Sequence, residues 1–165
     1  MGYLIILRGP AGSGKDTIGK YLVEKLGGDD QVCMLDLDIT GPLEQQFLKK
    51  LEESLHYKHV IGMLFWGGTH TENTDSWIVN FKNRNYTIIS VVLHASLQTL
   101  IQRVEKRGHD YKPPEEMKQH FEEFNRIRSI FADNAQVKEI SVDTEGKSPE
   151  KVADEILSIL MNSLT

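Results

Sequence analysis

The sequence predicts an α/β fold, a doubly wound parallel sheet with helices on both faces. Two observations predict it: five short apolar runs of strand length, and helical patterns that separate each run from the next. Strands of a parallel sheet are buried on both faces and therefore appear as continuous apolar runs, and each connection between them needs a crossover, usually a helix. Ligands of such sheets bind at the carboxyl ends of the strands. Site residues are therefore expected directly after the apolar runs.

The five apolar runs are rich in leucine, isoleucine and valine and define the expected strands. They occupy residues 4–7, 31–37, 59–66, 86–93 and 137–142. Their length and their β-branched residues favour strands over buried helices. Five parallel strands joined by right-handed crossovers form one open sheet.

Apolar residues recur every three or four positions between the strands, which is the helical repeat. The first of these helices begins near Lys15 and ends at Gly27 and Gly28, because glycine readily adopts the left-handed conformation that closes a helix. The second is opened by Pro42, and the third covers residues 74–83.

Three further helices are expected in the second half of the chain. Ser96 is a suitable helix N-cap, and residues 108–114 contain a glycine and two prolines that break the helix it opens. Another helix follows this break, and Ser148 and Pro149 cap and open the last one. The apolar stripe of the helix after the break is Met117, Phe121, Phe124 and Phe131.

Length, charge and cysteine content limit the class of protein. The chain has 165 residues without linker or repeat, so a single domain over residues 1–165 is expected. Its formal charge of −5 argues against a nucleic-acid partner, because such proteins usually carry a basic stripe. Cys33 is the only cysteine, which excludes an intrachain disulfide, and the first apolar run is too short for a signal peptide or membrane span. We expect a cytoplasmic protein without a membrane partner that acts on small molecules.

A glycine-rich sequence, GPAGSGKDT, follows the first strand and opens the first helix. The spacing G-x-x-x-x-G-K in this context is the Walker A motif, in which backbone N–H groups surround phosphate oxygens and the lysine binds the β- and γ-phosphates. The alternative is a glycine-rich turn with a chance lysine, against which the spacing and the context argue. The predicted nucleotide-binding residues of this loop are Gly9, Gly12, Ser13, Gly14, Lys15, Asp16 and Thr17.

The residue after Lys15 departs from the usual motif. This position normally holds a serine or threonine whose hydroxyl binds magnesium, but here it is Asp16, and Thr17 follows. Asp16 or Thr17 is therefore an uncertain metal ligand. Asp16 either acts on magnesium through water or is a first-turn carboxylate that the helix dipole favours. Both interpretations remain open.

Two aspartates close the second strand. Asp36 and Asp38 are two residues apart, so on an extended strand they share a face and can both point at the ligand crevice. The alternative is that they cap the following turn. The third strand has no carboxylate at its end and no Asn-Lys-x-Asp motif is present, which argues against a motor ATPase or a GTPase.

In these motifs the chain resembles the P-loop small-molecule kinases, the group of shikimate kinase, gluconate kinase and nucleoside monophosphate kinase. The motifs are the GPAGSGKDT loop, the Asp-x-Asp after the second strand, the Gly-Gly after the third, and a Leu-x-x-Arg-x-x-x-Arg sequence before Gly108. The resemblance implies a three-layer P-loop NTPase fold. Its five-stranded parallel sheet would have the order 2-3-1-4-5, with a helical lid at about residues 104–120.

The resemblance also implies roles for individual residues. Asp36 would assist magnesium through water, and Asp38 would bind the acceptor hydroxyl and take its proton. Gly67 and Gly68 would lie against the acceptor. The implied nucleotide ligands outside the loop are Arg103 and Arg107 of the lid helix, and Thr144 in the segment 142–149 that faces adenine. Alternatively, the two arginines belong to a solvated helix face.

Together these features predict an enzyme that moves the γ-phosphate of ATP to a hydroxyl or phosphate of a small-molecule acceptor, with Mg²⁺ as cofactor. The predicted catalytic residues are Lys15, Asp38 and Arg103. The acceptor and the oligomeric state are left open. Candidate acceptor ligands are Arg84, Arg126 and Arg128. The alternatives are a nucleotide-binding regulatory module without catalysis and a polynucleotide 5′-end kinase.

Overall fold

The computed structural model describes residues 1–38, 44–64, 71–131 and 133–162. Strands and helices alternate from β1 (Gly2–Arg8) to α6 (Pro149–Asn162). The elements between them are α1 (Lys15–Lys25), β2 (Val32–Asp36), α2 (Glu44–Ser54), β3 (His59–Leu64), α3 (Thr71–Asn83), β4 (Tyr86–His94), α4 (Leu97–Arg107), α5 (Pro114–Ile127) and β5 (Val137–Asp143).

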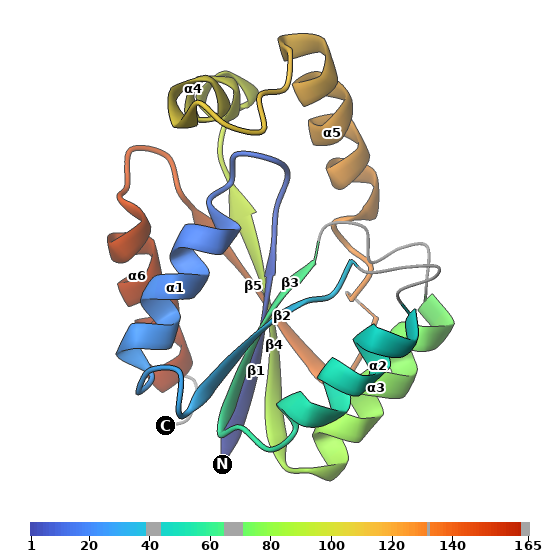
Figure 1. The fold of residues 1–165 in the computed structure, drawn as a ribbon. Coiled ribbons are helices and arrows are strands. Elements are labelled where there is room, and N and C mark those ends of the chain that lie inside the picture. The colour runs from blue at the N-terminus through green and yellow to red at the C-terminus, as the bar shows by residue number, and fades with distance from the viewer. Residues whose placement is uncertain (39–43, 65–70, 132, 163–165) are drawn as a thin grey trace.

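The strands form one five-stranded sheet in the order β2-β3-β1-β4-β5 (Figure 1). All neighbouring strands pair in parallel, so the predicted fold class and strand order are confirmed. At the centre of the sheet lies β1, whose residues Leu4, Ile5, Ile6 and Leu7 are fully buried. Because the strands are parallel, their carboxyl ends all lie at one edge of the sheet, as ligand binding in such folds requires.

Each face of the sheet packs against its own helices (Figure 1). Successive residues of a strand point to opposite faces. Ile5 and Leu7 of β1 therefore pack with α1 and α6, whereas Leu4 and Ile6 pack with α2 and α3. The resulting three layers hold the central strand from both sides and fix the position of the loop that follows it.

Two helices, α4 and α5, extend beyond the carboxyl edge of the sheet (Figure 1). Leu100 and Val104 of α4 pack against Met117 of α5 in an apolar cluster of their own, which also contacts Ala11 of the glycine-rich loop. The helices thus cover the edge at which the site residues are expected. Within the part of the chain that the structure describes, no helix has the length and apolar character needed to span a membrane.

The helix ends follow the predicted signals. The Ser96 hydroxyl accepts a hydrogen bond from the Thr99 N–H at 3.2 Å, which confirms the N-cap of α4. Gly108 ends the same helix with a φ angle of 72°. Gly27 and Gly28 follow α1 with φ angles of 117° and 80°, the left-handed conformation expected there.

Two predicted helix boundaries were wrong, the strand ends differ from the prediction by one or two residues, and other boundaries cannot be compared. The helix after the break ends at Ile127, so Phe131 lies beyond it. The Phe131 ring is buried in the core with residues of α2 and α3, and this burial explains why an apolar residue stands at that position. The third helix begins at Thr71 rather than at residue 74. The predicted helix start at Pro42 and the predicted strand end at residues 65–66 lie outside the described residues.

Candidate functional site

The glycine-rich loop leads from β1 into α1 at the carboxyl edge of the central strand. Gly12 and Gly14 have φ angles of 81° and 89°, a conformation that side chains other than hydrogen disfavour. A Cβ on Gly12 would also lie 2.8 Å from the carbonyl oxygen of Leu100, because α4 crosses the loop at this point. Gly14 is the N-cap of α1, so the unpaired N–H groups of the first helical turn open toward the loop.

Lys15 is the first residue of α1, and its side chain folds back over the loop. Its Nζ donates to the Gly9 carbonyl oxygen and lies 3.4 Å from the Pro10 carbonyl oxygen and 3.5 Å from Ser13 Oγ. Burial lowers the pKa of Lys15 to about 8, although nearby carboxylates, Asp38 foremost, oppose the shift. A partly buried cation beside a helix N-terminus and a glycine cradle fits the charge and shape of a triphosphate.

Asp16 and Thr17 occupy the first turn of α1, and both side chains are exposed. The carboxylate of Asp16 lies at the positive end of the helix dipole and also raises the pKa of Lys15, against the effect of burial. An exposed carboxylate and hydroxyl at the mouth of the loop fit either a metal-facing or a dipole-stabilising role.

The two aspartates after β2 lie in different surroundings. The Asp36 carboxylate accepts a hydrogen bond from the Asp38 N–H at 2.9 Å, so it stabilises the turn after the strand. Asp38 is partly buried, and its charge raises the pKa of both Arg8 and Lys15, against the effect of burial on each. The charges of both aspartates therefore act on Lys15, that of Asp38 more strongly, and Asp36 in addition has the turn-capping role that was the alternative for both.

Arg103 of α4 reaches the segment that follows β5. Its Nη1 donates to Thr144 Oγ1 at 2.9 Å and lies 3.5 Å from the Gly12 carbonyl oxygen, and its Nη2 donates to the Thr144 carbonyl oxygen at 2.7 Å. Thr144 is 2% exposed, and both its N–H and its hydroxyl donate to the His94 carbonyl oxygen. Three predicted nucleotide ligands, Gly12, Arg103 and Thr144, thus lie together.

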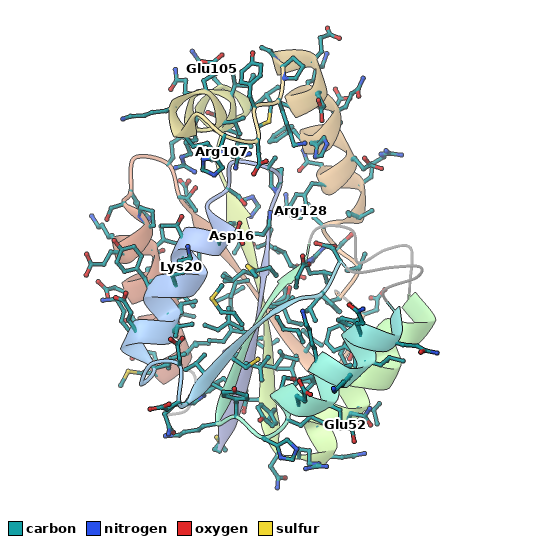
Figure 2. All side chains as sticks on the ribbon, in the orientation of Figure 1. Asp16, Lys20, Glu52, Glu105, Arg107 and Arg128 are labelled. Atoms are coloured by element: carbon teal, nitrogen blue, oxygen red, sulfur yellow. The ribbon has the colours of Figure 1, made fainter. Side chains whose placement is uncertain are left out.

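Arg107 ends α4 and is exposed. Its Nε donates to the His109 carbonyl oxygen and its Nη2 to the Asp110 carbonyl oxygen, each at 3.0 Å. Figure 2 shows Arg107 between α4 and the glycine-rich loop, and its charge lowers the pKa of Lys15. Arg107 therefore stabilises the turn after α4 and adds positive charge above the loop. The predicted acceptor residues Gly67 and Gly68 lie outside the described residues.

Arg8, the last residue of β1, belongs to none of the sequence motifs. Its side chain is completely buried, and its guanidinium carbon lies 5.7 Å from the ring centroid of Phe124 and 5.2 Å from that of Phe131. The guanidinium donates to the carbonyl oxygens of Ile127, at 2.8 Å, and Arg128. These carbonyls lie at the C-terminal end of α5, so Arg8 connects the strand before the glycine-rich loop to that helix.

The charge of Arg8 is only partly balanced by its surroundings. Glu139 of β5 lies 3.5 Å from Nη1, and Nε is buried without a partner among the described residues. Burial lowers the pKa of Arg8 to about 10, and Glu139 and Asp38 oppose this shift. Arg8 thus stays charged at neutral pH. A charged residue at the end of an otherwise apolar strand was the signal in the sequence that could have identified it.

The three arginines considered for acceptor binding lie in different parts of the fold. Arg84 lies in the turn before β4, at the opposite edge of the sheet, and Arg126 is 75% exposed beside Glu123. Of these three, Arg128 lies at the carboxyl edge, where its Nη2 is 3.1 Å from His94 Nε2. Figure 2 shows Arg128 beside the glycine-rich loop on the side of α5.

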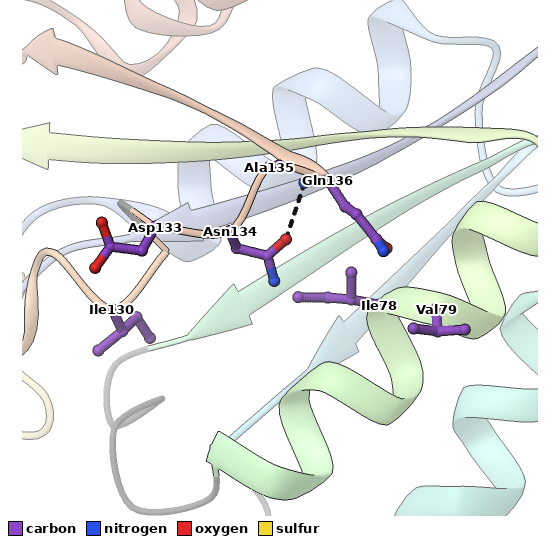
Figure 3. A pocket seen from close by; sticks show the side chains of 7 residues that line it. All are labelled: Ile78, Val79, Ile130, Asp133, Asn134, Ala135 and Gln136. Carbon is purple, nitrogen blue, oxygen red and sulfur yellow. Dashed lines mark hydrogen bonds between the residues drawn. The ribbon is translucent and has the colours of Figure 1, made fainter.

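A pocket of about 410 Å³ lies elsewhere, between α3 and the segment before β5 (Figure 3). Its lining residues are Ile78, Val79, Ile130, Asp133, Asn134, Ala135 and Gln136. None of the described residues predicted for the site lines this pocket, and no charged group in it is buried. The candidate site is therefore the carboxyl edge around the glycine-rich loop.

Comparison with known proteins agrees with this geometry. A family model described as AAA domain matches residues 5–123, from the central strand through the glycine-rich loop to most of α5. The chain belongs to the AAA domain family. In this AAA domain the matched region contains the loop, both aspartates after β2 and the two arginines of α4.

Curated relatives of this AAA domain protein are kinases by name. A shikimate kinase of Persephonella marina is 29% identical over 171 residues, covering 93% of this chain and 96% of the relative. A putative adenylate kinase of Thermococcus kodakarensis is 28% identical over 159 residues, covering 95% of this chain and 85% of the relative. The resemblance to the P-loop small-molecule kinases is thereby confirmed, and it supports an enzyme of the kinase type.

Solved structures share the fold of this AAA domain protein. A gluconokinase from Sinorhizobium meliloti 1021 matches with a TM-score of 0.61 and 16% identity, covering 98% of this chain and 95% of that one. A tunicamycin resistance protein from Deinococcus radiodurans also matches with a TM-score of 0.61, at 18% identity, covering 97% of this chain and 96% of that one. At these identities the likeness concerns the fold.

Proposed function

We propose that this protein is a single-domain, ATP-dependent phosphotransferase that moves the γ-phosphate of ATP to a hydroxyl or phosphate of a small-molecule acceptor. The observation that carries the proposal is the position of Lys15 in a glycine loop with Asp38 near it. This arrangement combines a cation for the phosphates with a carboxylate for the acceptor at one edge of the sheet.

Phosphoryl transfer requires in-line alignment and positive charge around the transferred group. Lys15 would bind the β- and γ-phosphates, and its pKa of about 8 leaves it charged at neutral pH. Arg103 adds a second charge at the rim of the loop, beside Gly12. Asp38 would accept a hydrogen bond from the acceptor hydroxyl and take its proton as the oxygen bonds to phosphorus.

Magnesium bound with the nucleotide would neutralise phosphate charge and orient the phosphates. Asp36 is the candidate to hold its water shell, because its carboxylate is exposed and binds the Asp38 N–H through one of its two oxygens, Oδ1. Asp16 and Thr17 are exposed on the first turn of α1 and are further candidates. These oxygen donors suit a hard cation that keeps several of its waters.

Closure over the acceptor would exclude water from the reaction, as is usual in enzymes of this kind. The candidate lid is the segment of about residues 104–120, which includes the turn at Gly108 and the start of α5. Asp110 has a φ angle of 49°, so this turn contains a second residue in the left-handed region. Gly67 and Gly68 remain the proposed contacts for the acceptor.

A screen of phosphoryl acceptors tests the proposed function. Hydroxylated metabolites, nucleosides and nucleotides are incubated with ATP and magnesium, and the phosphorylated product is measured. We expect Lys15→Ala and Asp38→Asn each to lower turnover by about 10²-fold or more, the typical effect of removing a group that stabilises the transition state. Asp30→Asn, an exposed aspartate at the opposite edge of the sheet, is the matched control and should leave turnover unchanged.

One alternative has a specific observation in its favour. Asp16 follows the loop lysine where a serine or threonine is usual, and this departure suits a nucleotide-binding regulatory module that transfers nothing. ATP binding without product from any acceptor would favour that module. Phosphate transfer to an oligonucleotide end at low salt would instead identify a polynucleotide kinase.

A further inference from the structure

The loop after β5, residues 144–148, is bound to the N-terminus of α4. The Glu145 carboxylate accepts hydrogen bonds from the Ser96 N–H at 2.9 Å, from the Ser96 hydroxyl at 3.4 Å and from the Thr99 hydroxyl. The two hydroxyls also contact each other at 3.0 Å. One carboxylate thus binds the first turn of a helix that lies 49 positions away in the sequence.

The same loop is bound to α4 a second time, two turns further along the helix. Arg103 donates to the hydroxyl and the carbonyl oxygen of Thr144, as described above. Within the loop, the Lys147 N–H donates to the Thr144 carbonyl oxygen at 3.2 Å, and Gly146 has a φ angle of 65°. Two attachments at separate points of one helix prevent the loop from rotating about either one.

The helix itself is closely packed against the glycine-rich loop. The Leu100 carbonyl oxygen leaves no room for a side chain on Gly12, and Val104 Cγ2 would lie 3.2 Å from such a Cβ. The glycine-rich loop, α4 and residues 144–148 therefore form one connected unit. Phosphates bound by the glycine-rich loop would leave the rest of the nucleotide beside α4 and the loop after β5.

We propose that Glu145 is a positioning residue: it holds residues 144–148 against α4 and so preforms the part of the site that contacts the base of the bound nucleotide. This inference rests on the proposed function only in that a nucleoside triphosphate binds at the glycine-rich loop. A preformed loop is not ordered by the ligand, so less of the binding free energy is lost to ordering. Without Glu145, the hydrogen bonds of Arg103 to Thr144 are the attachment to α4 described here that remains, and the base would bind a less ordered surface.

The charge of Glu145 supports this role. Hydrogen bonds from Thr99 and from the Ser96 backbone lower the pKa of Glu145, and the charge of Arg103 acts in the same direction. The carboxylate is therefore ionised at neutral pH. It also lies at the N-terminal end of α4, where the helix dipole favours a negative charge.

Two ligands separate the base from the phosphates. ATP contains both, whereas inorganic tripolyphosphate contains the phosphates alone, and the affinity of each for the full chain is measured by calorimetry with magnesium. We expect Glu145→Ala to weaken ATP binding about tenfold or more and to change tripolyphosphate binding less than about twofold. Glu145→Gln keeps an oxygen that can accept from the Ser96 N–H and should recover part of the ATP affinity. Glu155→Ala is the matched control, because it removes a carboxylate of α6 that binds Lys147 of the same loop at 2.7 Å and leaves Glu145 and Arg103 in place; neither affinity should change.

Other outcomes overturn the inference. If Glu145→Ala weakens the binding of ATP and of tripolyphosphate equally, the variant disturbs the glycine-rich loop or the whole fold. A lower thermal unfolding temperature would identify damage to the fold. If ATP binding is unchanged, the loop does not need Glu145. The result is independent of catalysis: the expected pattern together with no phosphate transfer to any acceptor would support the positioning role and contradict the proposed function.

Discussion

At the scale of single residues, the Lys15 ammonium group lies where burial opposes its charge. Its Nζ contacts oxygens of its own loop, and burial lowers the pKa of the group to about 8. A bound triphosphate would bring negative charge within reach of Nζ and raise this pKa again. The protonation of Lys15 and the binding of the nucleotide are therefore coupled.

This coupling predicts how ATP affinity depends on pH. Above pH 8 the free protein loses the Lys15 proton while the complex keeps it, so binding takes up a proton and affinity falls with rising pH, by at most about tenfold per pH unit. Calorimetry at pH 7.5, 8.5 and 9.5, in buffers of different ionisation enthalpy, measures both effects. Lys15→Arg stays charged over this range and should not show the decline. Equal ATP affinity of the unmodified protein at all three pH values would contradict the coupling between Lys15 protonation and nucleotide binding.

Arg8 is a residue whose removal should mainly affect stability. Arg8→Ala removes the guanidinium group that binds the carbonyl oxygens at the end of α5 and the Glu139 carboxylate. Breaking a buried charged interaction in this way lowers the free energy of unfolding by about 3–5 kcal/mol. Urea unfolding measures the change in the free energy of unfolding. Arg84→Ala removes an exposed arginine and should cost less than about 0.5 kcal/mol. A loss below about 1 kcal/mol for Arg8→Ala would mean that the guanidinium contributes little net stabilisation.

At the scale of elements, the site depends on how α4 lies against the glycine-rich loop. Leu100 and Val104 of this helix contact the loop on one side, while Ser96 and Arg103 bind the segment after β5 on the other. The position of one helix therefore determines the geometry of two loops. At Gly12 the helix lies so near the loop that an added Cβ would be 2.8 Å from the Leu100 carbonyl oxygen.

Substitution of Gly12 tests this contact. Gly12→Ala adds a Cβ 2.8 Å from a backbone oxygen, in addition to the strain of its positive φ, so α4 or the loop must move and ATP affinity should fall about tenfold or more. Gly28→Ala is matched in φ, at 80° against 81°, but has no atom within 4 Å of the added Cβ. It should lower stability by about 1 kcal/mol and leave ATP affinity unchanged. Equal ATP affinity for the two variants would show that the contact with α4 is unimportant for binding.

At the scale of the whole molecule, two histidines make the stability of the fold depend on pH. His59 is 4% exposed, and its Nδ1 accepts a hydrogen bond from the Tyr3 N–H at 3.2 Å, while His94 contacts Arg128 at the tip of β4. Burial is the largest cause that lowers the pKa of each. In the folded protein both therefore take up a proton at a lower pH than in the unfolded chain, where they titrate near their usual pKa of about 6.5.

The sign of the effect follows from these shifts. Below about pH 6.5 the unfolded chain binds more protons than the folded one, so the free energy of unfolding decreases as the pH falls. Urea unfolding at pH 7.5, 6.5 and 5.5 should show a falling midpoint, and a protein with His59→Gln and His94→Gln should show a smaller fall. His56→Gln changes an exposed histidine and should leave the fall as it is. An unchanged fall in the double variant would assign the effect to other groups.

The sequence by itself determined the fold and the centre of the site, because both are encoded by residues close together in the chain. Apolar runs and helical repeats predicted the alternation of elements, and the contiguous GPAGSGKDT sequence predicted the loop, since its spacing needs only neighbouring residues. The prediction failed where the apolar pattern continued beyond the end of a helix. Phe131 was assigned to the helix that ends at Ile127, but it follows that helix and is buried against α2 and α3.

Only the tertiary structure decided which distant side chains meet at the carboxyl edge. Arg8 binds carbonyls 119 and 120 positions away, and Glu145 binds α4 across 49 positions. The two aspartates after β2 were equivalent by spacing, but Asp36 binds the turn, and the charge of Asp38 has the larger effect on Lys15. These contacts depend on the order of strands in the sheet and on the packing of α4 and α5 over its edge. No local periodicity carries that information, because it arises when elements remote in sequence are brought side by side.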